Sequence, residues 1–228
     1  MKKENISKII WTTIFAIAMG FLEATVVIYL RIIYYAHGFS FPLRSFIEPA
    51  ILNIEWIREI ATIIMLLAIG FIAGKKKYER FAYFIYAFAV WDIFYYVFLK
   101  LALNWPSSLF DWDLLFLIPW PWVGPVIAPI ICSILMIVFA LIIIKGYDEG
   151  KQVKITILEW TLFIISALLI LYTWLIDYGR IITLTNNQDF YNIISSYIPQ
   201  SYNYLLFFIG IIIALFGIIE FYLRNRKH

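Results

Sequence analysis

Long apolar runs separated by short polar breaks dominate the pattern of hydrophobic and polar positions along this chain. A helix needs about 20 mostly apolar residues to cross the hydrocarbon core of a bilayer. The runs that are long enough cover residues 9–34, 54–73, 81–103, 123–144, 155–178 and 204–223. The pattern therefore predicts an all-α, polytopic membrane helix bundle of about six transmembrane helices, forming a single integral membrane domain over residues 1–228.

Composition supports this class. The chain is 64% hydrophobic and 14% charged, whereas a soluble domain is about half apolar and about a quarter charged. The N-terminal apolar run is too long for a signal peptide, and no small-residue cleavage site follows it, so we expect a retained first span. The formal charge of +3 does not indicate a nucleic-acid partner, because the basic residues lie in short clusters between apolar runs.

The positions of Lys and Arg predict the orientation. Basic clusters occur at the N-terminus, at residues 75–80, at residues 145–154 and at residues 224–227. With six spans, all four clusters fall on one side of the membrane. Loops rich in Lys and Arg stay in the cytoplasm. We therefore expect both termini to be cytoplasmic in a multi-pass protein of the cell (inner) membrane.

Charged side chains interrupt the first three apolar runs, where burying one costs at least about 2.5–3.5 kcal/mol and where a partner or a wet cavity is usual. Glu23 and Asp92 lie near the middle of the first and third runs, and a trio on the second run follows the spacing of one helix face. These groups cluster in the predicted outer half of the bundle. The candidate binding residues are Arg31, Glu55, Arg58, Glu59, Tyr96, Lys100, Asp111, Asp113, Trp120 and Trp122.

Two interpretations of these charges stay open. In the structural one, Arg58 pairs locally with Glu55 and Glu59 and locks the helices together. In the functional one, Glu23 and Asp92 are candidate catalytic acids, because neither has an opposite charge one helical turn away. Such a carboxyl either pairs across helices or sits protonated. Glu159 lies near the predicted inner surface, where a charged residue needs no special account.

A stretch rich in proline and tryptophan, LIPWPWVGPVIAP, precedes the fourth span. Proline removes a backbone donor, but Pro121 is tolerable in the first turn of a helix. The short apolar run at residues 114–118 cannot span a bilayer. The region is therefore either a surface linker or a re-entrant lid. As a lid, residues 120–129 should line one cavity with Glu23, Arg58 and Asp92.

The residue inventory restricts the cofactors. The only histidines are His37, in a predicted loop, and His228, at the tail, so neither a bis-histidine haem site nor a zinc site of the His/Cys type fits inside the bundle. The lone Cys132 lies in an apolar run as a small core residue. No nucleotide-binding glycine motif is present. We expect no metal and no cofactor.

Several segments carry a resemblance to a family. GFLEATVVIYLR, IREIATIIMLLAIGFIAG, VWDIFYYVFLK and WDLLFLIPWPWVGPVIAP resemble an uncharacterised family of prokaryotic multi-pass membrane proteins. The resemblance covers roughly the first four spans and implies no activity. A weaker likeness, without a full motif, connects the chain to membrane-embedded carotenoid and terpene cyclases, which also place acids and aromatic residues inside small helical bundles.

Three functions compete on this basis. The first is a site that binds or transforms a lipid-like or isoprenoid small molecule, with Glu23 or Asp92 as the acid; whether it is an enzyme stays open. The second is a non-catalytic subunit or scaffold whose charges pair with another membrane protein. The third, a proton-coupled transporter, is less favoured because the inner halves of the spans are uniformly apolar.

Overall fold

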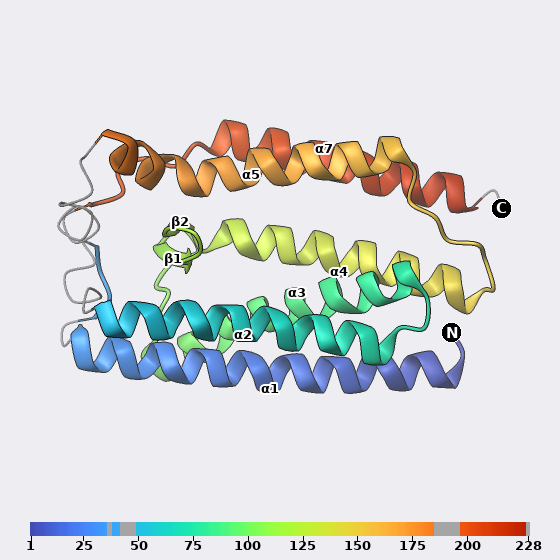
Figure 1. Ribbon diagram of the computed structural model, residues 1–228, viewed down its shortest axis with the longest axis horizontal. Coiled ribbons are helices and arrows are strands. Elements are labelled where there is room, and N and C mark those ends of the chain that lie inside the picture. Colours follow the sequence, from blue (N-terminus) through green and yellow to red (C-terminus); the bar gives the residue numbers. More distant parts are fainter. Residues whose placement is uncertain (36–37, 42–48, 185–196, 227–228) are drawn as a thin grey trace.

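The computed structural model describes residues 1–35, 38–41, 49–184 and 197–226, and six long helices run side by side through them (Figure 1). The helices are α1 (Lys3–Tyr34), α2 (Pro49–Ala73), α3 (Lys77–Leu103), α4 (Ile127–Asp148), α5 (Ile157–Leu184) and α7 (Tyr204–Arg226). Each contains a stretch long and apolar enough to cross a membrane. The all-α bundle expected from the sequence is confirmed, and it indicates a multi-pass membrane protein.

Helix α3 is the centre of the bundle. It packs against α1, α2 and α4, while α5 packs mainly on α7 and on the short strand β2 (Trp122–Pro125). The main hydrophobic core contains Tyr83 and Trp91 of α3, Phe139 and Ile143 of α4, and Phe221 of α7. The start of α1, the end of α7, and the α2–α3 and α4–α5 connections lie at one end of the bundle (Figure 1).

Two glycines let the outer helices approach α3 closely. A Cβ atom on Gly20 of α1 would lie 2.9 Å from the backbone oxygen of Trp91, and one on Gly70 of α2 would lie 2.7 Å from that of Arg80. Small residues at such contacts allow van der Waals packing between backbones in a membrane. A side chain at either position would therefore force its helix away from α3.

The segment before α4 is a β-hairpin, which the sequence did not predict. Strand β1 (Trp112–Phe116) pairs antiparallel with β2, with Asp113 opposite Gly124 and an irregularity between Leu114 and Phe116. The fourth helix therefore begins at Ile127, and its predicted start at residue 123 was wrong.

Proline explains this difference. The first turn of a helix would have tolerated Pro121. In the structure, Pro121 instead lies buried just before β2. A ring at residue 121 or 125 removes a helical hydrogen bond, whereas a strand end tolerates it. A two-stranded hairpin is marginal alone, and this one packs on α5 through Trp122, whose ring stacks at 6.0 Å from that of Trp174.

Glu159, at the start of α5, takes a larger part in the packing than its expected place near the inner surface indicated. It is fully buried, and its carboxylate accepts hydrogen bonds from Arg224 of α7 at 2.9 Å and from the Thr156 backbone at 2.7 Å. Removing one partner of such a buried pair leaves an uncompensated charge. This contact fastens α5 to α7 at the end of the bundle that carries the basic connections.

Candidate functional site

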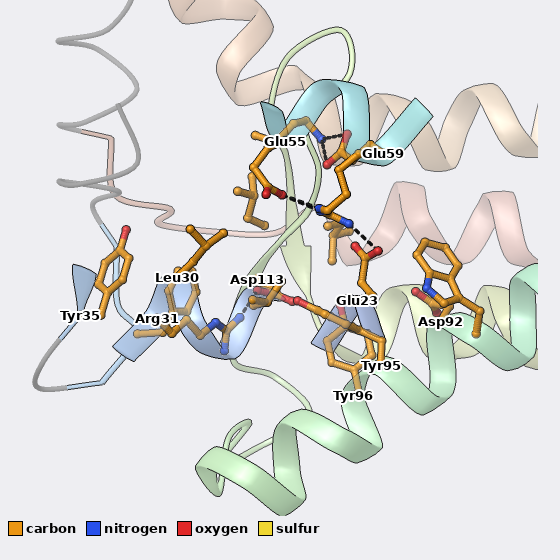
Figure 2. Close-up of a pocket in the computed structure, with 17 residues that line it drawn as sticks. Glu23, Leu30, Arg31, Tyr35, Glu55, Glu59, Asp92, Tyr95, Tyr96 and Asp113 are labelled. Carbon is orange, nitrogen blue, oxygen red and sulfur yellow. Dashed lines mark hydrogen bonds and ion pairs between the residues drawn. The ribbon is translucent and has the colours of Figure 1, made fainter. Parts of the chain in front are cut away.

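Charged side chains from three helices and the hairpin line one small cavity of about 60 Å³, the polar cavity (Figure 2). The sequence places these charges far apart. The packing of α1 and α2 on α3 brings their charges together, and Asp113 of β1 joins them through its ion pair with Arg31. The charged lining residues are Glu23, Arg31, Glu55, Arg58, Glu59, Asp92 and Asp113. The aromatic lining residues are Tyr35, Phe39, Trp91, Tyr95 and Tyr96.

Arg58 bridges two helices. Its guanidinium forms an ion pair with Glu23 of α1 and another, at 2.7 Å, with Glu55 one turn away on α2. The predicted Glu55–Arg58 pair is therefore present. Of the two alternatives expected for Glu23, pairing across helices or staying protonated, the structure shows pairing across helices. A carboxylate held by a guanidinium is a poor proton donor, so Glu23 serves the architecture of the polar cavity better than acid chemistry.

Glu59 differs from its predicted role. It does not pair with Arg58; both of its carboxylate oxygens lie 3.0 Å from the backbone nitrogen of Leu117, just after β1. A carboxylate accepting a backbone N–H group makes a strong, charge-assisted hydrogen bond. Glu59 therefore attaches the hairpin to α2. Sequence spacing carries no signal for a backbone partner, which is why the local Arg58 was favoured.

Arg31 and Asp113 form the most buried ion pair of the polar cavity. Arg31 Nη2 lies 2.9 Å from Asp113 Oδ1, and the two residues are 6% and 1% exposed. The guanidinium also lies over the rings of Phe39, at 4.2 Å, and Trp105, at 3.8 Å. Burial raises the pKa of the Asp113 carboxyl, and the Arg31 charge opposes that shift. Within the described residues, Arg31 Nη1 and Asp113 Oδ2 have no hydrogen-bond partner.

Asp92 lies deeper along α3 and has a different environment. Ser133 of α4 donates a hydrogen bond to Asp92 Oδ2 at 2.8 Å, and no cationic side chain pairs with this carboxylate in the part of the chain that the structure describes. The neighbouring Trp91 is 6% exposed, and its indole N–H group has no acceptor there. Buried polar groups are normally hydrogen-bonded, so an unpaired one points to a missing partner.

A second and larger cavity, the apolar cavity, adjoins the first. It has a volume of about 340 Å³ and lies between α3, α4, α5, α7 and the hairpin. Ligand pockets of about 300–1,000 Å³ are typical for small molecules. Most of its lining is aliphatic or aromatic, including Phe88, Met136, Phe163, Ile170, Trp174 and Ile211. Trp91, Asp92 and Leu115 line both cavities and form the wall between them.

Four of the predicted residues lie outside the polar cavity. Lys100 donates to the backbone oxygen of Pro106 at 2.8 Å, and Asp111 accepts a hydrogen bond from Ser107 Oγ at 2.7 Å. Trp120 packs in a separate cluster around Val123 and Tyr178, and Trp122 lines the apolar cavity.

The expected position of the proline-rich segment was therefore wrong in part. Residues 113–115 and 117 of the hairpin line the polar cavity beside Glu23, whereas Trp122 and Pro129 meet only the apolar one. The hairpin thus contributes to both cavities: of its residues that the sequence indicated, Asp113 lines the polar cavity and Trp122 lines the apolar one. Ser133, the one serine or threonine of α4, was not among the predicted residues, although it stands out in the most apolar of the described helices.

Within the described residues, no group of three His, Cys, Asp or Glu side chains is arranged to hold a metal ion. Comparison with protein-family models, curated proteins and solved structures finds no match for this chain. The function is therefore inferred from the geometry of the two adjoining cavities.

Proposed function

We propose that this protein is a cell-membrane protein that binds a lipid-like small molecule, with the polar end of the ligand in the polar cavity and its chain in the apolar cavity. The observation that carries the proposal is the shared wall of Trp91, Asp92 and Leu115. A site that is charged on one side of this wall and apolar on the other matches a molecule with the same division.

The packing of α5 supports access from the bilayer. Helix α5 makes few backbone contacts with α3, although both line the apolar cavity. Aromatic contacts close the two ends, with Phe81 against Trp160 at 5.6 Å and Trp122 against Trp174 at 6.0 Å. Between these contacts, a ligand dissolved in the bilayer can reach the apolar cavity without crossing water.

If the ligand is transformed, Asp92 is the acid that the geometry favours. Glu23 and Glu55 face Arg58, Asp113 faces Arg31, and Glu59 accepts a backbone N–H group. Asp92 alone among the five carboxyls of the polar cavity relies on a neutral hydroxyl. General acid–base chemistry needs a carboxyl that can exchange its proton at the reacting atom.

The two other functions gain less support. A scaffold that pairs its charges with another membrane protein would present them outward, whereas the charges around Arg58 face a cavity inside the chain (Figure 2). A transporter needs a polar route through the inner half of the bundle. The core there consists of residues such as Phe139, Ile143 and Phe221.

The proposal is tested by filling the apolar cavity. Ala167 of α5 lines it, and Ala167→Phe adds a ring inside. Ile134→Phe on α4 is the matched control, because Ile134 is among the exposed hydrophobic residues. We expect organic extracts of the purified wild type and of the control to contain an amphiphile, detected by mass spectrometry, that Ala167→Phe loses. Identical extracts from all three folded proteins would refute the proposal.

A further inference from the structure

We infer that the polar end of the ligand is a hydroxyl group, which accepts a hydrogen bond from the Trp91 indole and donates one to the Asp92 carboxylate. The inference rests on the proposed function and names the class of its ligand, an apolar-chain alcohol. Among the residues that the structure describes, Trp91 and Asp92 are the only polar side chains that line both cavities, and the inference begins at this wall.

Trp91 and Asp92 both have unused hydrogen-bonding capacity at this wall. The Trp91 indole is a donor only, and it has no acceptor within the described residues. The Asp92 carboxylate is an acceptor with more capacity than the single Ser133 hydroxyl uses. A hydroxyl group both donates and accepts, so it satisfies both side chains at once. An ammonium group has no lone pair to accept from Trp91.

The charges that line the polar cavity disfavour an anionic head on the ligand. Five carboxyls and two guanidiniums line the polar cavity. Both guanidiniums already face carboxylates, Arg58 two of them and Arg31 one. Among the described residues, a phosphate or carboxylate head would find no uncompensated cation and would meet an excess of acids. Burying a charge without a partner is costly.

Another unpaired donor of the polar cavity, on Arg31, agrees with a neutral head. Arg31 Nη1 lacks an acceptor among the described residues, but Asp113 already neutralises the Arg31 charge at 2.9 Å. A neutral acceptor is therefore enough to satisfy Arg31 Nη1, and a negative charge is not needed. A further oxygen on the ligand, such as a second hydroxyl or a carbonyl, would suit that position.

The chain carries its own reporter for the test. Cys132 is the only cysteine of the protein and lines the apolar cavity together with Asp92. A bound chain should therefore protect Cys132 from an apolar maleimide. The probes are farnesol, farnesylamine and farnesyl phosphate, which share one chain and differ in the head. We expect farnesol to protect the purified full-length protein at the lowest concentration, roughly tenfold below the phosphate, the factor that one hydrogen bond to a charged group supplies.

Two variants test the contacts. Trp91→Phe keeps a ring and removes the N–H donor, and Asp92→Asn keeps the shape and removes the charge. Each should raise the farnesol concentration needed for protection about 3- to 10-fold. Asp92→Asn should at the same time lower the farnesyl phosphate concentration needed, because it removes one of the acids that repel the phosphate. Trp11→Phe, at an exposed tryptophan of α1, is the matched control. An Ile134→Cys reporter in a Cys132→Ser background should label equally with and without each probe.

The outcomes of this experiment distinguish a failure of the hydroxyl inference from a failure of the proposed function. Protection by farnesyl phosphate or farnesylamine at lower concentration than farnesol would overturn the hydroxyl inference while supporting an amphiphile site. Equal farnesol protection in wild type and in both folded variants would overturn it as well. Absence of protection by all three probes would defeat the proposed function itself.

Discussion

Both carboxylate oxygens of Glu59 lie 3.0 Å from the backbone nitrogen of Leu117, so a side chain of α2 holds the residue that follows β1. Irregular backbone at membrane depth persists only where protein or water satisfies its polar groups. Glu59 provides that satisfaction at the end of the strand. It thereby fixes the hairpin as a wall of both cavities.

The first prediction follows from this contact. Glu59→Leu removes the acceptor of the Leu117 N–H group and should destabilise the protein by about 1–3 kcal/mol. Hydrogen exchange measured by mass spectrometry should show faster exchange in the peptide that contains residues 112–125. Glu59→Gln is the matched control, since it keeps one acceptor oxygen, and its effect should be smaller. Equal exchange in wild type and Glu59→Leu would contradict the role assigned to Glu59.

The same contact shows what the sequence could and could not predict. The helices were predictable because apolar runs of spanning length have few alternatives in a bilayer. The clustering of Glu23, Arg58 and Asp92 was also expected, because all three charges lie in the predicted outer half of the bundle. Partners that lie on the backbone or on a distant helix leave no periodic signal, and Leu117 and Ser133 are of this kind.

The hairpin escaped prediction for a related reason. The strand pairing of Trp112 with Pro125 joins residues of a segment that has no glycine or asparagine turn between its strands. Apart from Asp113, the residues of its two strands are apolar or glycine. An alternating pattern, the usual sign of a strand, is therefore missing.

The second prediction concerns the ion pair that joins α1 to α2. Arg58→Met leaves Glu23 and Glu55 without their cation and should cost about 3–5 kcal/mol, as is typical of buried pairs broken on one side. The double variant with Glu23→Gln should lose less than the two single variants together. Denaturant unfolding in detergent, followed by circular dichroism, measures these differences.

A matched control for Arg58 lies at the opposite end of the bundle. Lys145 and Glu149 form an exposed pair at 3.9 Å, and Lys145→Met should change the free energy of unfolding by only about 0–1 kcal/mol. Strict additivity of the Glu23 and Arg58 variants would show that their contact contributes nothing to the fold.

The third prediction concerns orientation. The basic connections at residues 75–80 and 145–154 share one end of the bundle with the start of α1, and the hairpin lies at the other end (Figure 1). The asymmetry of Lys and Arg favours a cytoplasmic basic end. In a Cys132→Ser background, a thiol reagent that cannot cross membranes should label Ser108→Cys in intact cells but not Lys76→Cys. The reverse pattern would invert the topology.

The last prediction concerns the close contact behind the site. A Cβ atom on Gly20 would lie 2.9 Å from the backbone oxygen of Trp91, and backbone cannot rotate away as a side chain can. Gly20→Ala gains about 1 kcal/mol of helix propensity but forces α1 from α3, at a cost of about 1–3 kcal/mol. We expect lower thermal stability and weaker farnesol protection of Cys132, because Trp91 shifts with α3. Ala68→Val, on an exposed face of α2, should change neither, and a Gly20→Ala protein that matches wild type in both measurements would rule out this tight contact.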